Sequence, residues 1–144
     1  MEIIIRRISE QDAAAVNQLS TQLGYAMPIE QTLANIRSVL GTKGHNAFVA
    51  LHANKIVGWI GVAEALQIES APFSEIRGVI VDEQYRGHGI GKLLIEKVKQ
   101  WSKEAGNKTV RLRCNTIRKE AHLFYQHLGF NEIKEQKVFE MKVV

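Results

Sequence analysis

Cysteine is nearly absent from this 144-residue sequence, and its scarcity excludes several classes of protein. The single cysteine, Cys114, can form no internal disulfide and cannot belong to a multi-cysteine zinc site. His122 and His127 are five residues apart, which does not place both on one helical face as ligands of one metal ion. We therefore expect no metal, a reducing compartment and, by default, a cytoplasmic location.

Long hydrophobic runs are missing as well. The N-terminal run Ile3-Ile4-Ile5 is stopped by Arg6-Arg7, which makes it too short for a signal peptide or a membrane span. The formal net charge is +4, but basic and acidic residues are mixed along the chain, which argues against a nucleic-acid-binding face. We expect neither membrane nor nucleic acid as a partner. A basic surface would suit an anionic ligand, although net charge alone does not separate this from simple solubility.

The chain also lacks linkers and repeats, so residues 1–144 are expected to form a single domain. Apolar patterning predicts strands over 3–8, 47–51, 56–68, 75–81 and 109–114, and two more within 130–144. Helices are predicted after the capping-box sequence at 9–12, from Pro28 as first helical residue to about 40, and over 89–105 and 119–128. The order β-α-α-β-β-β-α-β-α-β-β predicts an α/β fold with a mixed sheet.

A glycine-rich loop, Arg86-Gly87-His88-Gly89-Ile90-Gly91-Lys92, lies between a predicted strand and the clearest predicted helix. The first turn of a helix has backbone N–H groups without partners and the positive end of the dipole, so this position attracts phosphate. Walker A, dinucleotide-binding and protein-kinase loops all fail at required positions, such as the third glycine that would fall on Lys92. An ordinary glycine-rich turn remains an equal alternative.

Gly78 interrupts the β-forming run over 75–81, where an internal glycine often marks a bulge or a close backbone approach. With regular pairing, Glu75 and Arg77 would share a face with Val79 and Val81. One face of the strand would then carry both charged and apolar side chains. A one-residue bulge would shift the alternation and separate the two kinds. A bulge would also release backbone groups of this strand for a ligand.

Residues 81–91 resemble the acetyl-CoA signature of the GNAT superfamily of N-acetyltransferases, and Asn115 with residues 118–130 resembles its second motif. The resemblance spans the whole chain and implies the acyl-CoA N-acyltransferase fold with splayed central strands. It implies that backbone amides from Arg86 to Lys92 hold the pyrophosphate and that the main chain of Val79, Ile80 and Val81 pairs with pantetheine. The Ile80 amide would also polarise the thioester carbonyl, Asn115 would bind the pantetheine arm, and Arg118 and His122 would line the channel.

The resemblance also implies catalytic roles for two residues. Tyr125 would act as the general acid that protonates the departing thiolate, although helical periodicity alone makes it a core aromatic beside Phe124. Glu75 would act as the base that deprotonates the amine. An equal alternative for Glu75 is a surface carboxylate that forms an ion pair with Arg77. Cys114 alternates with strand residues, so we interpret it as a small buried side chain.

The implied activity is transfer of an acetyl group from acetyl-CoA to a primary amine, by direct attack within a ternary complex and without a metal. The alternative from another class is a non-catalytic acyl-CoA-binding sensor or interaction module with the same fold. The acceptor stays open among polyamines, aminoglycosides, amino acids and protein amines. We expect a monomer or a homodimer.

Overall fold

The computed structural model describes residues 1–144, which divide by their internal contacts into two compact units, Met1–Leu112 and Arg113–Val144. The first unit holds a five-stranded sheet with three helices, and the second holds one helix and an extended tail. The expectation of a single domain over 1–144 stays a prediction. None of the helices is both long and apolar enough to span a membrane.

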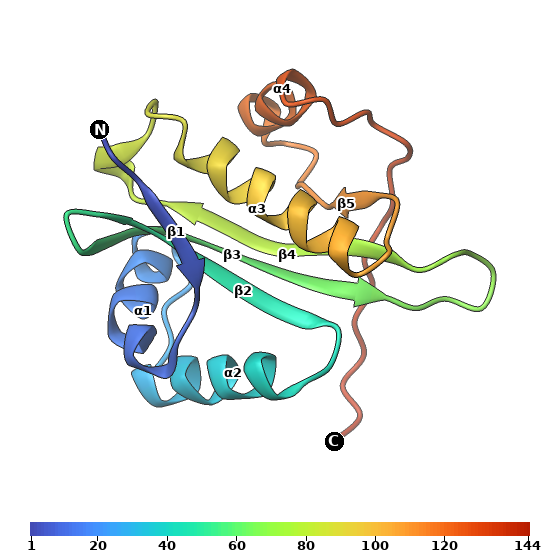
Figure 1. Ribbon diagram of the computed structural model, residues 1–144. Helices are drawn as coiled ribbons and strands as arrows, with labels where there is room; N and C mark the ends of the chain where they lie inside the picture. Colours follow the sequence, from blue (N-terminus) through green and yellow to red (C-terminus); the bar gives the residue numbers. More distant parts are fainter. The chain divides into compact units, whose positions relative to one another are not determined.

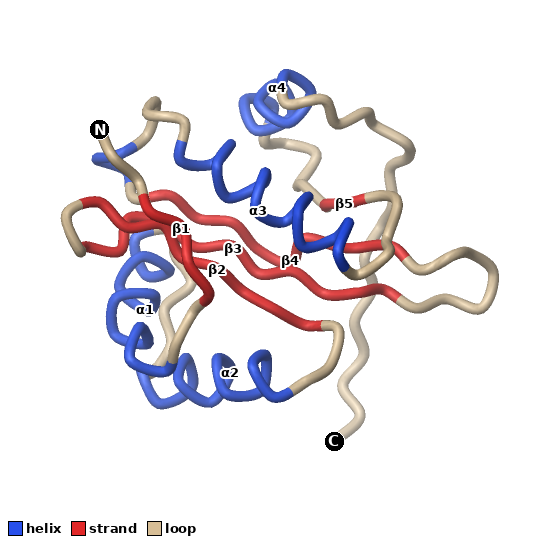
Figure 2. The backbone as a smooth tube through the Cα atoms, in the orientation of Figure 1, coloured by secondary structure: helices blue, strands red, loops and turns tan.

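The sheet of the first unit follows the chain order, with β1 at one edge and β5 at the other (Figure 2). Strands β1 to β4 pair antiparallel, and β5 runs parallel to β4. The predicted α/β class with a mixed sheet is therefore confirmed. The strands are β1 (Ile4–Arg7), β2 (His45–His52), β3 (Lys55–Ala65), β4 (Phe73–Val81) and β5 (Val110–Leu112).

Helices cover both faces of this sheet (Figure 1). Helices α1 (Ala13–Gln22) and α2 (Ile29–Gly41) lie on one face, and α3 (Ile90–Glu104) lies on the other. The first face holds a buried apolar cluster, and on the second face Ile90 and Leu94 of α3 pack close to Gly58. Burial on both sides explains why central strands such as β2 read as apolar runs rather than as clean alternation. The cluster on the first face consists of Ile8, Ala13, Val16, Ile36, Ala47 and Val49.

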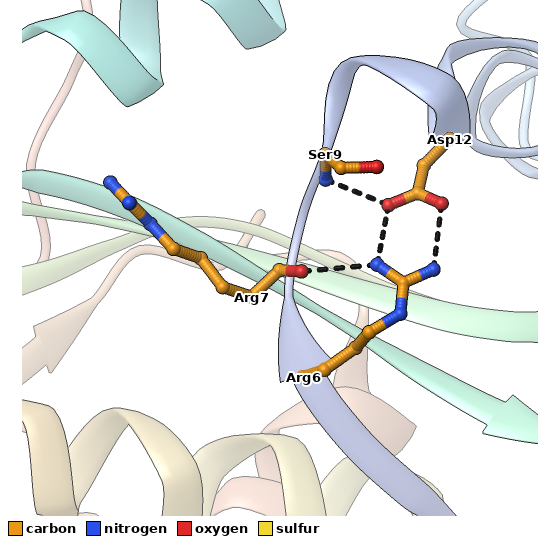
Figure 3. A network of polar contacts seen from close by, with 4 residues as sticks. All are labelled: Arg6, Arg7, Ser9 and Asp12. Carbon is orange, nitrogen blue, oxygen red and sulfur yellow. Dashed lines mark hydrogen bonds and ion pairs between the residues drawn. The ribbon is translucent and has the colours of Figure 1, made fainter.

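The chain enters α1 through a short 3-10 turn, η1 (Glu10–Asp12), where the predicted capping box is present. The Asp12 carboxylate accepts hydrogen bonds from the Ser9 backbone N–H and from both terminal nitrogens of Arg6, each at 2.8 Å (Figure 3). Its hydrogen bond with Arg6 is the main reason that the pKa of Asp12 is lowered, against the opposing effect of burial. This network ties the end of β1 to the start of α1.

Several predicted boundaries differ from the structure. Pro28 is the residue before α2 rather than its first residue, because its ψ of 145° is extended. Strand β3 ends at Ala65 instead of 68, and β5 ends at Leu112, so Cys114 lies outside the sheet and is only half-buried. The β2–β3 hairpin turns at Ala53 and Asn54, both with positive φ as in a type I′ turn.

The second unit contains α4 (Lys119–His127), close to the predicted helix, and Gly129 follows it with a φ of +101°. The two strands predicted within 130–144 are absent. The alternating apolar residues Phe139, Met141 and Val143 are 84–90% exposed and pair with no strand. Alternation alone predicted strands here, but a strand also needs a neighbouring edge with which to exchange backbone hydrogen bonds.

Candidate functional site

The bulge predicted at Gly78 is present in β4. Gly78 lies opposite Gly61 of β3, but the next pair joins Ile76 to Val62, which leaves Arg77 as an extra residue. Because Glu75 lies opposite Ala63, two residues from Gly61, Glu75 and Gly78 point to the same face of the sheet. Because of the bulge, the charged Glu75 no longer shares a face of the strand with the apolar Val79 and Val81.

The free edge of β4 begins where its pairing with β5 stops. Strand β5 pairs with β4 over three residue pairs, the last of which joins Ile76 to Leu112. Beyond this point Val79, Ile80 and Val81 pair only with β3. Strands β4 and β5 therefore pair over a short stretch only, and the edge of β4 that follows can accept an extended ligand as an added strand.

The glycine-rich loop that follows β4 needs glycine at two positions. Gly87 has a φ of +82° and Gly89 a φ of +77°, the left-handed region that side chains disfavour. A Cβ atom added at either residue would meet no atom within 4 Å, so the backbone borders open space on this side. A ligand can approach this backbone directly.

The loop leads into the N-terminus of α3. Gly89 is the N-cap and contributes no side-chain cap, so the first N–H groups of α3 keep no intrahelical partner. Ile90 is 1% exposed and anchors this end of the helix in the core, which leaves its backbone as the part that can bind a ligand. The side chains of Arg86, His88 and Lys92 are exposed around the loop. Uncapped amides, a positive dipole and open glycines fit the diphosphate of acetyl-CoA.

Asp82 is a buried residue that supports the loop, and no role was predicted for it. It is 4% exposed, its carboxylate accepts a hydrogen bond from the Gln84 N–H at 3.0 Å, and its own N–H donates to the Val57 carbonyl at 2.8 Å. These bonds fix the start of the loop through the turn η2 (Glu83–Tyr85). An aspartate directly after a strand and before a turn is a recognisable capping signal that could have indicated this role.

Glu75 combines features of both interpretations considered for it. Its carboxylate lies 3.3 Å from Nε of Arg77, so the ion pair of the alternative interpretation is present. Its side chain is only 10% exposed, however, whereas that of Arg77 is 60% exposed. Glu75 is therefore a buried carboxylate at the bulge and not the surface group that the alternative assumed.

In the second unit, Asn115 organises the turn before α4. Its side-chain oxygen accepts from the Ile117 N–H at 3.1 Å, and its carbonyl accepts from the Arg118 N–H at 3.0 Å. Nε2 of His122 lies 2.8 Å from the same carbonyl oxygen, which holds the imidazole against this turn. Asn115, Arg118 and His122 thus belong to one local arrangement.

Tyr125 lies on α4 between two aromatic neighbours. Its ring meets Phe124 at 5.4 Å and Phe130 at 5.9 Å between centroids, both edge to face. Burial raises the pKa of Tyr125, Cys114 adds to this effect, and Arg118 acts against it. The phenol is therefore protonated at neutral pH, the form that a general acid requires.

The predicted site residues form two sets. Residues 79–81 and 86–92, with Glu75, lie in the first unit, whereas Asn115, Arg118, His122 and Tyr125 lie in the second. No three side chains of His, Cys, Asp or Glu are grouped so that they could hold a metal ion.

Comparison with known sequences agrees with this geometry. The sequence model of the acetyltransferase (GNAT) family matches residues 15–130, and the chain belongs to this family. The chain is 38% identical over 85 residues to an uncharacterized N-acetyltransferase, MJ1207, of Methanocaldococcus jannaschii, a match that covers 59% of this chain and 34% of the relative. It is 28% identical to aminoglycoside N(6')-acetyltransferase type 1 of Stenotrophomonas maltophilia, over 95% of this chain and 92% of that enzyme.

The fold is also shared with solved structures. The aminoglycoside acetyltransferase AAC(6')-Iy, in complex with a bisubstrate analogue of coenzyme A, superposes with a TM-score of 0.88. The match covers 99% of each chain at 20% sequence identity, so it shows a common fold. The family and these relatives support acetyl transfer as the class of activity.

Proposed function

We propose that this protein transfers the acetyl group of acetyl-CoA to a primary amine, by direct attack within a ternary complex. One observation carries the proposal. A bulged strand with a free edge runs into a loop whose left-handed glycines border open space and end at an uncapped helix N-terminus. Coenzyme A has an extended pantetheine arm joined to a charged diphosphate. The edge of β4 can bind the arm, and the glycine-rich loop that follows directly in sequence can bind the diphosphate.

In this proposal the first unit binds the acetyl donor, which supplies an activated thioester. The N–H groups of residues 86–92 hold the diphosphate, and the free edge of Val79, Ile80 and Val81 pairs with the pantetheine arm. The N–H of Ile80 stabilises the negative charge that develops on the carbonyl oxygen during attack. Ile80 is 6% exposed, so its packing in the core fixes the strand at this point.

Two side chains move protons in the proposed reaction. Glu75 takes a proton from the ammonium group of the acceptor, which is otherwise charged at neutral pH with a pKa of about 10.4. The free amine attacks the carbonyl carbon to form a tetrahedral intermediate. The carbon–sulfur bond then breaks, and the new amide nitrogen releases its second proton to solvent, from which Tyr125 recovers the proton that it gives to sulfur. Tyr125 then donates its proton to the leaving thiolate, and its raised pKa supports this role because the phenol stays protonated until the transfer. Asn115, Arg118 and His122 line the channel of the arm.

Calorimetry with coenzyme A tests the binding part of the proposal. We expect a one-to-one complex and a higher melting temperature, because saturation to 100 times Kd stabilises the folded state by about 2.7 kcal/mol. A folded sample that shows neither heat of binding nor a thermal shift at millimolar coenzyme A would overturn the proposal.

Thiol release from acetyl-CoA tests catalysis. The amine panel should include polyamines, amino acids, a lysine peptide and aminoglycosides, the last because of the similarity to an aminoglycoside acetyltransferase. We expect amine-dependent release with at least one class, accompanied by a mass gain of one acetyl group on that amine. Binding of coenzyme A without release for any amine would favour the non-catalytic acyl-CoA-binding module.

A further inference from the structure

The indole ring of Trp59 lies directly on Gly78, the glycine at the bulge of β4. A Cβ atom added to Gly78 would lie 2.9 Å from Cη2 and 3.1 Å from Cζ3 of this ring. Both distances are too short for a side chain to fit without movement of the ring or the strand. By contrast, a Cβ added to Gly61, the residue opposite Gly78, would lie 3.8 Å from Cζ3, an ordinary contact.

The ring, and not the backbone conformation, explains the glycine at position 78. Gly78 is not among the six glycines with positive φ, so an L-amino acid could adopt its backbone angles. The space that a side chain would need is already filled by the far edge of the indole. Ring and glycine therefore form an interlocking pair, contributed by two neighbouring strands.

Packing holds the Trp59 ring in this position. Trp59 lies opposite Val49 on one side and Ile80 on the other, and it packs against the apolar cluster beneath α1 and α2. Its Nε1 atom is buried and has no hydrogen-bond partner. A buried donor without a partner is unfavourable, so the shape of the ring and not its polar atom accounts for its place.

We propose that Trp59 is a positioning residue that keeps the β4 bulge in the conformation required for coenzyme A. This role of Trp59 rests on the proposed function, because Gly78 immediately precedes Val79, Ile80 and Val81, whose free edge would bind pantetheine. A shift of Gly78 would move the backbone amides of these three residues and the start of the glycine-rich loop that follows β4. The indole prevents that shift by contact with Gly78 and by its place opposite Ile80.

A double-mutant cycle tests this role through the Kd of coenzyme A, measured by calorimetry, and the melting temperature. Gly78→Ala forces the new methyl group against the indole, and we expect Kd to rise about tenfold. Trp59→Phe lacks the outer ring atoms Cη2 and Cζ3, and we expect Kd to rise roughly threefold. The double variant has room for the methyl group, so its Kd should match that of Trp59→Phe alone. Gly61→Ala is the matched control and should stay within about twofold of wild type.

Two results would contradict the inference. One is a double variant whose loss of affinity equals the product of the two single losses, because independent effects exclude the interlock. The other is an equal loss in Gly61→Ala and Gly78→Ala. If Gly78→Ala does not fold, recovery of folding and of binding in the double variant supports the interlock, and its absence contradicts it. Wild-type protein that does not bind coenzyme A would overturn the proposed function, and this inference with it, whereas binding with independent effects overturns the inference alone.

Discussion

Replacement of Asp12 by alanine tests how the N-terminal network stabilises the first unit. The carboxylate is 6% exposed at the junction of β1 and α1 and receives hydrogen bonds at 2.8 Å from Arg6 and from the Ser9 N–H. Alanine removes all of these bonds at once. Arg6 is 40% exposed, so water can hydrate its guanidinium group after the change.

Exposure of Arg6 therefore limits the loss of stability. Because Arg6 is partly exposed to solvent, we expect its ion pair with Asp12 to contribute about 1 kcal/mol to the free energy of unfolding. Loss of the hydrogen bond to the Ser9 N–H, a helix-capping interaction, adds about 1 kcal/mol. We expect the free energy of unfolding to fall by about 2 kcal/mol. For a chain of this length, that corresponds to a decrease in melting temperature of about 4–8 °C.

The effect should depend on pH. The pKa of Asp12 is lowered in the folded protein, mainly by the hydrogen bond with Arg6. The carboxylate therefore contributes stability above its ordinary pKa of 3.8, and this contribution is lost as the pH falls through the lowered folded value. The difference between wild type and Asp12→Ala should be full at pH 7 and should shrink below pH 3.8.

Denaturant unfolding at pH 7 and at acidic pH, followed by circular dichroism, measures both effects. Glu10→Gln is the control. Glu10 lies in the same turn as Asp12, but its ion pair is with Arg37 of α2, and both of these side chains are more than half exposed. We expect this control to lose about 0.5 kcal/mol or less. Equal losses in the two variants, or a loss from Asp12→Ala that does not change with pH, would refute the assignment of stability to the buried carboxylate.

Other predictions concern the glycine-rich loop before α3 and Tyr125, the proposed general acid. Gly89→Ala should raise the Kd of coenzyme A about tenfold by calorimetry, because alanine in the left-handed region costs about 1–2 kcal/mol and relief of this strain displaces the amides proposed to bind the diphosphate. Gly106→Ala carries a similar backbone strain at the other end of α3 and should lower the melting temperature without changing that Kd. Tyr125→Phe should lower kcat about 100-fold or more while coenzyme A still binds, and unchanged turnover would exclude Tyr125 from the mechanism. Since burial raises the pKa of Tyr125, wild type should lose stability above pH 10.0 relative to Tyr125→Phe in denaturant unfolding.

Local sequence signals predicted the parts of the site that depend on local conformation. The apolar stripe of α3 predicted a helix within one residue of its observed bounds, because helical periodicity is written in neighbouring residues. Gly78 within a β-forming run predicted the bulge. The glycines at 87 and 89 lie where the chain adopts left-handed φ values, which glycine adopts without steric cost.

The sequence alone therefore determined the helices, the approximate positions of the five strands of the sheet, the bulge and the glycine loop, since each depends on residues close together in the chain. Only the tertiary structure decided which side chains the fold surrounds. It buried Glu75 although its neighbour Arg77 is exposed, and it placed Trp59 of β3 over Gly78 of β4. It also left the alternating tail after residue 130 without a strand partner. These outcomes depend on contacts between residues distant in the chain, which local periodicity and turn preferences do not encode.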